Sequence, residues 1–93
     1  MQNSFDELQK KVMQNQVART AAIENNLRRK LGETFDIHRK QQGLSIRNLA
    51  KAAKISELQA RRALHRELGG NLQLKTIIRI ADVLGLNITI STQ

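Results

Sequence analysis

The sequence predicts an all-α fold, a small helical bundle with an N-terminal helical extension and one short strand at the C-terminal end. Two observations predict the helices: strong helix formers fill most of the chain, and apolar residues recur every three or four positions. The chain has 93 residues, the length of one domain, and it contains no proline. It also contains no cysteine, which excludes a disulfide scaffold and the usual structural zinc sites. We therefore expect a single helical domain with an aliphatic core.

Residues 1–30 form the first predicted element, the N-terminal helical extension. Its apolar residues step by three to five positions and are sparse in the middle. One long helix and two helices broken near residues 14–16 both fit this pattern. Gly32 predicts a boundary, because glycine costs about 1 kcal/mol inside a helix relative to alanine. A separate helix is expected over residues 33–42, ended by Gly43 in a left-handed cap.

Two short helices are predicted next, each preceded by a serine that caps its first turn. Ser45 precedes residues 46–53, and Ser56 precedes residues 57–68. The inward positions of both helices are largely small, which lets the two helices approach each other closely. These positions are Ile46, Leu49, Ala50 and Ala53 on the first helix and Ala60, Ala63 and Leu64 on the second.

The last predicted helix covers residues 74–84 and ends at Gly85. Its expected buried residues are Leu74, Ile77, Ile78, Ala81 and Leu84. Residues 87–93 then alternate apolar and polar side chains and are rich in β-branched residues, which predicts a short strand.

The predicted C-terminal strand needs a partner, because a lone strand leaves its backbone hydrogen-bonding groups unpaired. We expect the same strand of a second subunit to pair with it, antiparallel across a two-fold axis. In such a homodimer Ile88 and Ile90 cover the bundle. A frayed tail is the alternative.

The charge of the chain is strongly positive, with a formal net charge of +8. Nucleic acid, an anionic membrane surface and an acidic protein are the partners that such a charge favours, and a solvated basic surface is the alternative. No apolar stretch is long enough to span a membrane, and the N-terminus is polar and acidic, unlike a signal peptide. We therefore expect a cytoplasmic protein that does not enter the membrane.

The outward positions of residues 57–68 carry side chains that can read base edges in the major groove. Arginine pairs with guanine, glutamine with adenine and glutamate with cytosine, and an apolar side chain can contact the thymine methyl group. The predicted base-reading residues are Glu57, Leu58, Gln59, Arg61, Arg62 and His65. A solvated, charged helix face is the alternative for a helix considered alone, but two capped helices joined by a tight turn favour binding in a groove.

The sequence predicts neither an enzyme nor a cofactor or metal site. His38 and His65 are the only histidines, and no cysteine accompanies them. No glycine-rich phosphate loop, nucleophile elbow or spaced carboxylate pair is present.

Residues 31–86 resemble the Xre-type helix-turn-helix regulators, the group of the phage lambda repressor and Cro. The resemblance follows an ordered series of blocks: LGETFDIHRKQQGLSIRNLA at residues 31–50, AKIS at 53–56, RAL at 62–64 and LKTIIRIADVLGL at 74–86. It implies a lambda-repressor-like bundle whose recognition helix, residues 56–68, enters the major groove. The implied function is a sequence-specific regulator of transcription, a repressor, that binds a pseudo-palindromic operator in double-stranded DNA as a homodimer and is encoded by a bacterium, plasmid or phage.

The resemblance also implies contacts to DNA phosphates. The implied contacts come from the start of the second helix and from the loop and helix that follow the recognition helix, and the basic residues near the recognition helix extend the set. The predicted phosphate-contacting residues are Ser45, Arg47, Lys54, Arg66, Asn71 and Lys75. Lys54 stands where the family usually has glycine, and a left-handed lysine costs roughly 1 kcal/mol there.

The extension and the tail leave a second function open. The tail also resembles those of certain antitoxins, so the alternative function is an antitoxin that represses its own operon and binds a toxin protein through residues 1–26. For the extension itself, packing on the bundle, dimerisation and contact of Arg28, Arg29 and Lys30 with phosphates all remain open.

Overall fold

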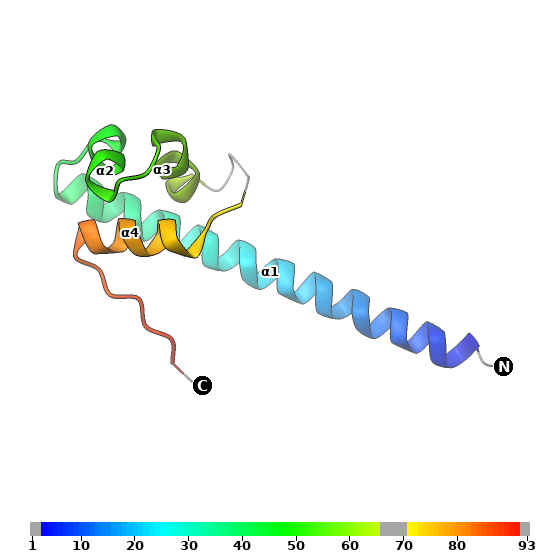
Figure 1. The fold of residues 1–93 in the computed structure, drawn as a ribbon. Helices are drawn as coiled ribbons and strands as arrows, with labels where there is room; N and C mark the ends of the chain where they lie inside the picture. The colour runs from blue at the N-terminus through cyan, green and yellow to red at the C-terminus, as the bar shows by residue number, and fades with distance from the viewer. Residues whose placement is uncertain (1–2, 66–70, 92–93) are drawn as a thin grey trace.

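The fold is all-α in the part of the chain that the computed structural model describes, residues 3–65 and 71–91. The helices are α1 (Asn3–Gln41), α2 (Ile46–Ala53), α3 (Glu57–Leu64) and α4 (Leu74–Leu84). Figure 1 shows α2, α3 and α4 gathered around the C-terminal part of α1, while the rest of α1 projects from this body as a single rod. The molecule is therefore elongated, with extents of 64, 29 and 18 Å along its principal axes.

α1 is one continuous helix, so the predicted boundary at Gly32 is wrong, and the helix has no break near residues 14–16. Gly32 is buried where α1 meets the end of α3. A Cβ atom at this position would lie 2.7 Å from the carbonyl oxygen of Leu64 and 3.3 Å from that of Ala63. The glycine is therefore needed for close packing between two helices, and this contact offsets its cost within α1.

The core lies where the four helices meet. Its largest fully buried side chains are Phe35 of α1, Leu49 of α2 and Ile80 of α4. Small residues fill the contacts of α2 and α3 as the sequence predicts, since Ala50, Ala53, Ala60, Ala63 and Leu64 are all buried. Ile46, expected on the same inward face, is half-buried and packs against the core.

α4 has its predicted bounds, but its buried face differs from the predicted one. Ala81 and Leu84 are buried as expected, and Ile77 is half-buried. Leu74 and Ile78 are instead 67% and 53% exposed, and Thr76 and Ile80 take their places inside. The sequence pattern could not fix this rotation, because apolar residues occupy more than one face of the helix.

α3 ends at Leu64, four residues before its predicted end. His65 leaves the helix with a φ of −125°, and its N–H donates to the carbonyl oxygen of Arg61 at 2.8 Å. At this end of α3 the Leu64 carbonyl lies against Gly32 of α1. The rest of the predicted recognition helix, from residue 66 onward, lies outside the described residues.

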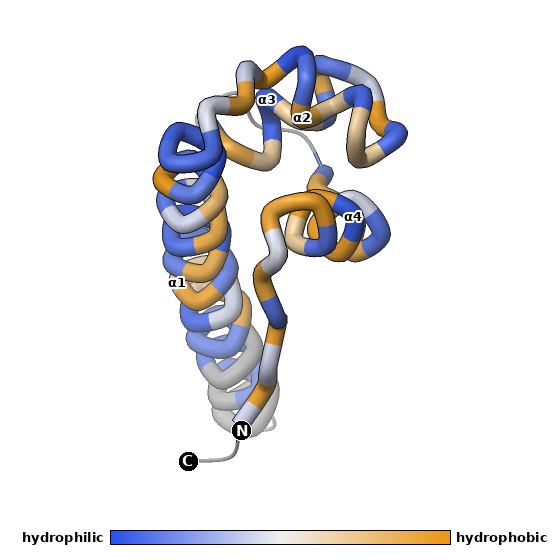
Figure 2. The backbone as a smooth tube through the Cα atoms, turned by 90° about the vertical axis from the view of Figure 1, so that its left-hand side faces the viewer, coloured by the Kyte–Doolittle hydropathy of each residue, from blue (hydrophilic) through white to orange (hydrophobic). Residues whose placement is uncertain are grey.

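The C-terminal tail, residues 86–91, has no regular secondary structure in this single chain, so the predicted strand is not seen. Figure 2 shows it leaving α4 as an extended segment. Ile88 is 47% exposed and Ile90 is 98% exposed. A strand forms only when another strand accepts its hydrogen bonds, so pairing between two tails stays a prediction.

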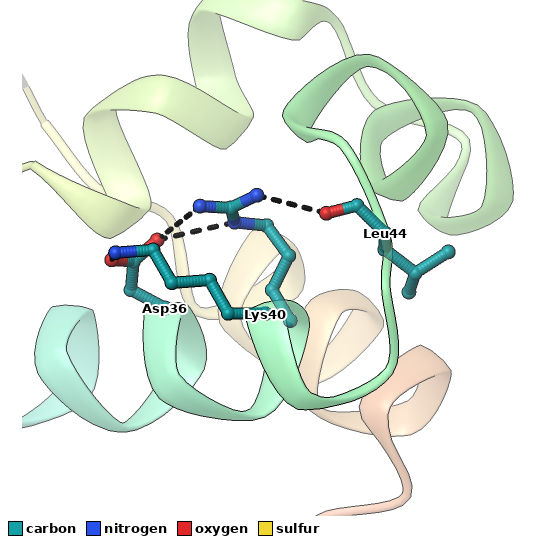
Figure 3. A network of polar contacts seen from close by, with 4 residues as sticks. Asp36, Lys40 and Leu44 are labelled. Carbon is teal, nitrogen blue, oxygen red and sulfur yellow. Dashed lines mark hydrogen bonds and ion pairs between the residues drawn. The ribbon is translucent and has the colours of Figure 1, made fainter.

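An ionic network joins the end of α1 to the turn before α2 (Figure 3). Two nitrogens of Arg39 donate to Oδ1 of Asp36 at 2.7 and 3.1 Å, and a third donates to the Leu44 carbonyl oxygen at 2.8 Å. Nζ of Lys40 lies 3.1 Å from the other carboxylate oxygen of Asp36. Burial alone would raise the pKa of Asp36, but the hydrogen bonds and charges of Arg39 and Lys40 outweigh it and hold this pKa below its ordinary value of 3.8.

We expect Gly32→Ala to lower the free energy of unfolding by about 1–3 kcal/mol, because the new methyl group meets a backbone carbonyl that cannot move aside. The same change at an exposed position within a helix raises the free energy of unfolding by about 1 kcal/mol. The sign of the measured change therefore shows whether Gly32 is needed for packing. Urea denaturation followed by circular dichroism measures the difference. Gly43→Ala is the control: its φ is +69° and nothing lies within 4 Å, so only backbone strain of about 1 kcal/mol is expected. A Gly32→Ala protein as stable as the parent would contradict the packing described here.

We expect Asp36→Asn to lower the free energy of unfolding by about 1 kcal/mol at neutral pH, because it weakens the charged hydrogen bonds to Arg39. A carboxyl whose pKa is lowered by folding stabilises the protein above its unfolded pKa of 3.8 and loses this contribution as the pH falls through the folded pKa. The difference between variant and parent should therefore shrink below pH 3.8. Glu33→Gln is the control, since Glu33 is 61% exposed and lies 3.7 Å from Arg29. A difference that stays constant with pH would count against the network.

Candidate nucleic-acid interface

α2 and α3 form a pair of short helices joined by a tight turn at residues 54–56. Both helices begin at the serine caps predicted from the sequence. Oγ of Ser45 accepts from the N–H of Asn48 at 3.0 Å, and Oγ of Ser56 accepts from the N–H of Gln59 at 3.1 Å. Gln59 completes a capping box, because its Oε1 accepts from the N–H of Ser56 at 3.1 Å. Local hydrogen bonds therefore fix where each helix begins.

Lys54 turns the chain from α2 toward α3 and adopts the left-handed conformation, with a φ of +59°. The N–H of Ile55 then donates to the Ala50 carbonyl oxygen at 3.0 Å. Nη1 of Arg79, on α4, donates to the Lys54 carbonyl oxygen at 3.2 Å. The turn is thus closed by backbone hydrogen bonds and attached to α4.

Four of the six predicted base-reading residues lie exposed on α3: Glu57, Leu58, Gln59 and Arg61. Nη2 of Arg61 lies 2.7 Å from Oε1 of Glu57, in an ion pair with half-exposed side chains. Such an exposed pair contributes only about 0.3–0.5 kcal/mol, so it leaves Arg61 available to a stronger partner. Leu58 is 52% exposed beside it. The side chain of Gln59 differs, because it is engaged in the capping box.

Arg62 is half-buried, so its predicted position on the outward face is wrong. It lines a hollow between α3 and the start of α4 together with Gln59, Asn71, Leu72, Gln73 and Thr76; we call it the α3–α4 hollow. Nε of Arg62 is buried and has no hydrogen-bond partner among the described residues. Arg62 follows Arg61 in the sequence but lies about 100° away around the helix axis, on the side where it lines the hollow with Asn71 and Leu72.

The α3–α4 hollow has the chemistry of an anion site. Gln73 occupies the N-cap position of α4, and its side chain makes no capping hydrogen bond. The N-terminus of a helix carries partial positive charge and unpaired N–H groups, which attract anions. The guanidinium of Arg62 lies in the same hollow, and Lys75 is exposed in the first turn of α4.

His65 also departs from the predicted outward face and is half-buried at the end of α3. It lines a hollow between α3 and α1 with Arg28, Arg29, Glu33 and Asp36. The short α3 causes this placement, because the chain leaves the helix at His65 just where it meets α1.

The predicted phosphate-contacting residues lie at four places. Ser45 and Arg47 are exposed at the start of α2, and Lys54 is exposed in the turn. Asn71 lies in the loop before α4, where it lines the α3–α4 hollow, and Lys75 follows in α4. Arg66 lies outside the described residues.

Sequence reasoning missed the capping role of Gln59, although the spacing Ser-x-x-Gln signals a capping box. Nothing in the sequence signalled the hollow around Arg62.

In the described ranges, 3–65 and 71–91, no three His, Cys, Asp or Glu side chains gather where they could bind a metal ion. Within the same ranges, no helix combines the length and the apolar character needed to cross a membrane.

Comparison of the chain with protein-family models, with curated proteins and with solved structures finds no match in any of the three. The resemblance of residues 31–86 to Xre-type regulators therefore stays a prediction from the sequence.

We expect Lys54→Gly to raise the free energy of unfolding by about 0.5–1 kcal/mol, because glycine adopts a positive φ without steric cost. Lys54→Ala removes the same charge but keeps a Cβ atom, so it should leave the strain in place. Urea denaturation of the two variants separates backbone strain from charge. Equal stabilities of the glycine and alanine variants would show that the turn carries no such strain.

Proposed function

We propose that this protein is a sequence-specific regulator of transcription, a repressor, that inserts α3 into the major groove of double-stranded DNA. One observation carries the proposal: α3 buries its alanines against its neighbours and leaves Glu57, Leu58 and Arg61 exposed on its outer face. The capped helix pair and the tight turn before α3 support it, because this geometry presents the second helix to a groove. The net charge of +8 favours a polyanion as the partner.

In this proposal the exposed residues of α3 read the bases. Arg61 exchanges its weak ion pair with Glu57 for two hydrogen bonds to a guanine. Leu58 offers an apolar contact to a thymine methyl group, and Glu57, once released, can accept from a cytosine amino group. Gln59 supports this indirectly, because it holds the first turn of α3 in place.

In this proposal the groups around α3 bind the phosphates of the DNA backbone. The α3–α4 hollow joins Arg62 and Asn71 to the N-terminus of α4, with Lys75 nearby, and this combination suits one phosphate of the backbone. Ser45, Arg47 and Lys54 extend the phosphate contacts to the start of α2 and to the turn. Arg62 thereby becomes a phosphate-binding residue in place of a base-reading one.

The proposed repressor acts as a homodimer on a pseudo-palindromic operator. The exposed tail supports this, because Ile88 and Ile90 lie on an extended segment whose alternating pattern fits antiparallel pairing with a second tail. Two copies of α3 would then contact half-sites about 34 Å apart.

A second candidate function is an antitoxin, which shares the DNA chemistry and adds a toxin partner. The observation that favours it is the projecting part of α1, where Val17 and Ile23 are 68% and 60% exposed. Co-purification of a small protein encoded beside this one would distinguish the antitoxin from a simple repressor.

The proposed function is tested by selecting bound duplexes from random DNA and measuring the affinity of the selected sequence by fluorescence anisotropy. The selected duplex should bind about 10³-fold or more tightly than random duplex at the same salt concentration. If the dimer neutralises about eight phosphates, affinity should fall by roughly 10⁴ between 50 and 200 mM salt. No enrichment of any sequence, or a flat response to salt, would exclude the proposal.

Substitutions assign the roles. Arg61→Ala should cost about 1–3 kcal/mol on the selected duplex and relax preference at one base pair. Arg61→Lys keeps the charge but loses the two-pronged hydrogen bonding, so it should also lose preference. Lys75→Ala should weaken all duplexes alike and reduce the salt slope by about one. Lys10→Ala, on the projecting part of α1, is the control for loss of charge and should change neither the base preference nor the salt slope. Retained base preference in both Arg61 variants would show that α3 does not read the DNA.

A further inference from the structure

The part of α1 that projects from the body, residues 3–26, is the largest surface that the proposed function leaves unused. Every side chain described in this projecting segment is exposed. An isolated helix is only marginally stable in water, because most helices are held by packing of an apolar face. The projecting segment therefore needs a partner that covers it.

The apolar face of the segment points away from α3. Ile23, within the segment, and Leu27, directly after it, are 60% and 56% exposed and are separated by one helical turn. Ile23 lies nine residues before Gly32, which places it about 180° around the helix from the α3 contact at 100° per residue. A partner bound on Ile23 would therefore leave the outer face of α3 open.

This face ends in a groove between α1 and the C-terminal tail. Leu27, Lys30, Leu31 and Thr34 form one wall of the groove, and Leu86, Asn87 and Ile88 form the other. The lining is mainly apolar, and it continues the exposed face of Ile23 and Leu27 along the axis of α1.

We propose that the projecting segment pairs antiparallel with the same segment of a second copy of this chain. A two-fold axis between residues 17 and 18 places position 12 of one copy opposite Ile23 of the other, and position 8 opposite Leu27. The sequence has valine at position 12 and leucine at position 8, so apolar residues meet at each of these levels. The same register places the N-terminal end of the second copy, with phenylalanine at position 5, at the groove beside Lys30 and Leu31.

The charges of the segment favour the antiparallel direction. Its acidic residues at positions 6 and 7 lie near one end, and Lys30, which follows the other end, lies about 20° from Ile23 around the helix axis. Antiparallel pairing brings the acidic end of each copy toward Lys30 of its partner. Parallel pairing would place the two copies of Lys30 side by side, which is unfavourable.

The middle of the segment defines the register. There the two-fold axis places Gln16 opposite Arg19 and Asn15 opposite Thr20, so a polar layer separates two apolar ones. A buried polar layer commonly fixes register and orientation in paired helices at some cost in affinity. The sparse apolar pattern in the middle of α1 is then a feature of the pairing.

The contact between projecting segments leaves α3 uncovered and meets the C-terminal tail only at the groove lined by Leu86, Asn87 and Ile88, so it extends the proposed function and does not rest on it. Together with the proposed pairing of tails, two isologous contacts on one chain give a closed tetramer when their two-fold axes cross at right angles. Each dimer keeps its two copies of α3 for DNA.

The test measures association by sedimentation velocity in a background that carries Ile90→Asp, which removes the tail contact at a residue that is 98% exposed. The background protein should be a dimer, and adding Ile23→Asp and Leu27→Asp should weaken dimerisation by at least about 100-fold. Asn25→Asp is the control: it adds one such negative charge about 160° from Ile23 and should remain dimeric. A background protein that is monomeric at high micromolar concentration would overturn the proposal and leave the segment to a foreign protein.

Cysteine cross-linking tests the direction, since the chain has no native cysteine. Oxidation of an equal mixture of Val12→Cys and Ile23→Cys proteins should give mainly the mixed disulfide. Identical positions lie about 16 Å apart in the antiparallel pair, beyond the Cα separation of about 7 Å that a disulfide bridges. Disulfides between identical positions would overturn the antiparallel register.

Fluorescence anisotropy with the selected duplex, measured on the Ile23→Asp/Leu27→Asp protein, separates the proposed DNA binding from the proposed pairing of segments. Base preference should persist when the segments no longer pair.

Discussion

The close approach of Gly32 on α1 to the carbonyl oxygen of Leu64 fixes where the end of α3 lies. A Cβ atom at position 32 would lie 2.7 Å from this oxygen, so no larger residue fits there without movement of a backbone. The end of α3 therefore rests directly on α1, and the chain leaves α3 at His65, which lines a hollow against α1. The alanines at positions 60 and 63 continue the same close packing on the inner face of α3. The outer face of α3 is exposed because its inner face packs closely against the neighbouring helices.

Two adjacent arginines of α3 show how the backbone assigns different chemistry to identical side chains. Arg61 is held only by an exposed ion pair with Glu57, which water and salt screen. Arg62 lies in the hollow at the start of α4, where its Nε is buried. In the proposed complex the first arginine is free to distinguish bases, while the second, already partly desolvated, suits a phosphate that all sequences share. The neighbouring positions would thus divide specificity and affinity between them.

The sequence predicts those parts of the fold that depend on local signals. The start of α2 follows from its serine cap and the end of α4 from its glycine cap, because each signal lies within one turn of the helix end that it fixes. The break expected at Gly32 is wrong because a residue 32 positions later offsets the cost of the glycine. The rotation of α4 and the place of Arg62 likewise depend on packing between distant segments. The predicted C-terminal strand is not seen in the single chain, because a strand needs a second strand to accept its hydrogen bonds.

The most direct measurement of the central claim is an amide NMR titration of the protein with a duplex about two helical turns long. The account predicts shifts at the start of α2, along the exposed face of α3 and at the N-terminus of α4, with little change at Val17 and Ile23 on the projecting part of α1. Shifts confined to the projecting part of α1, with α3 unaffected, would contradict it.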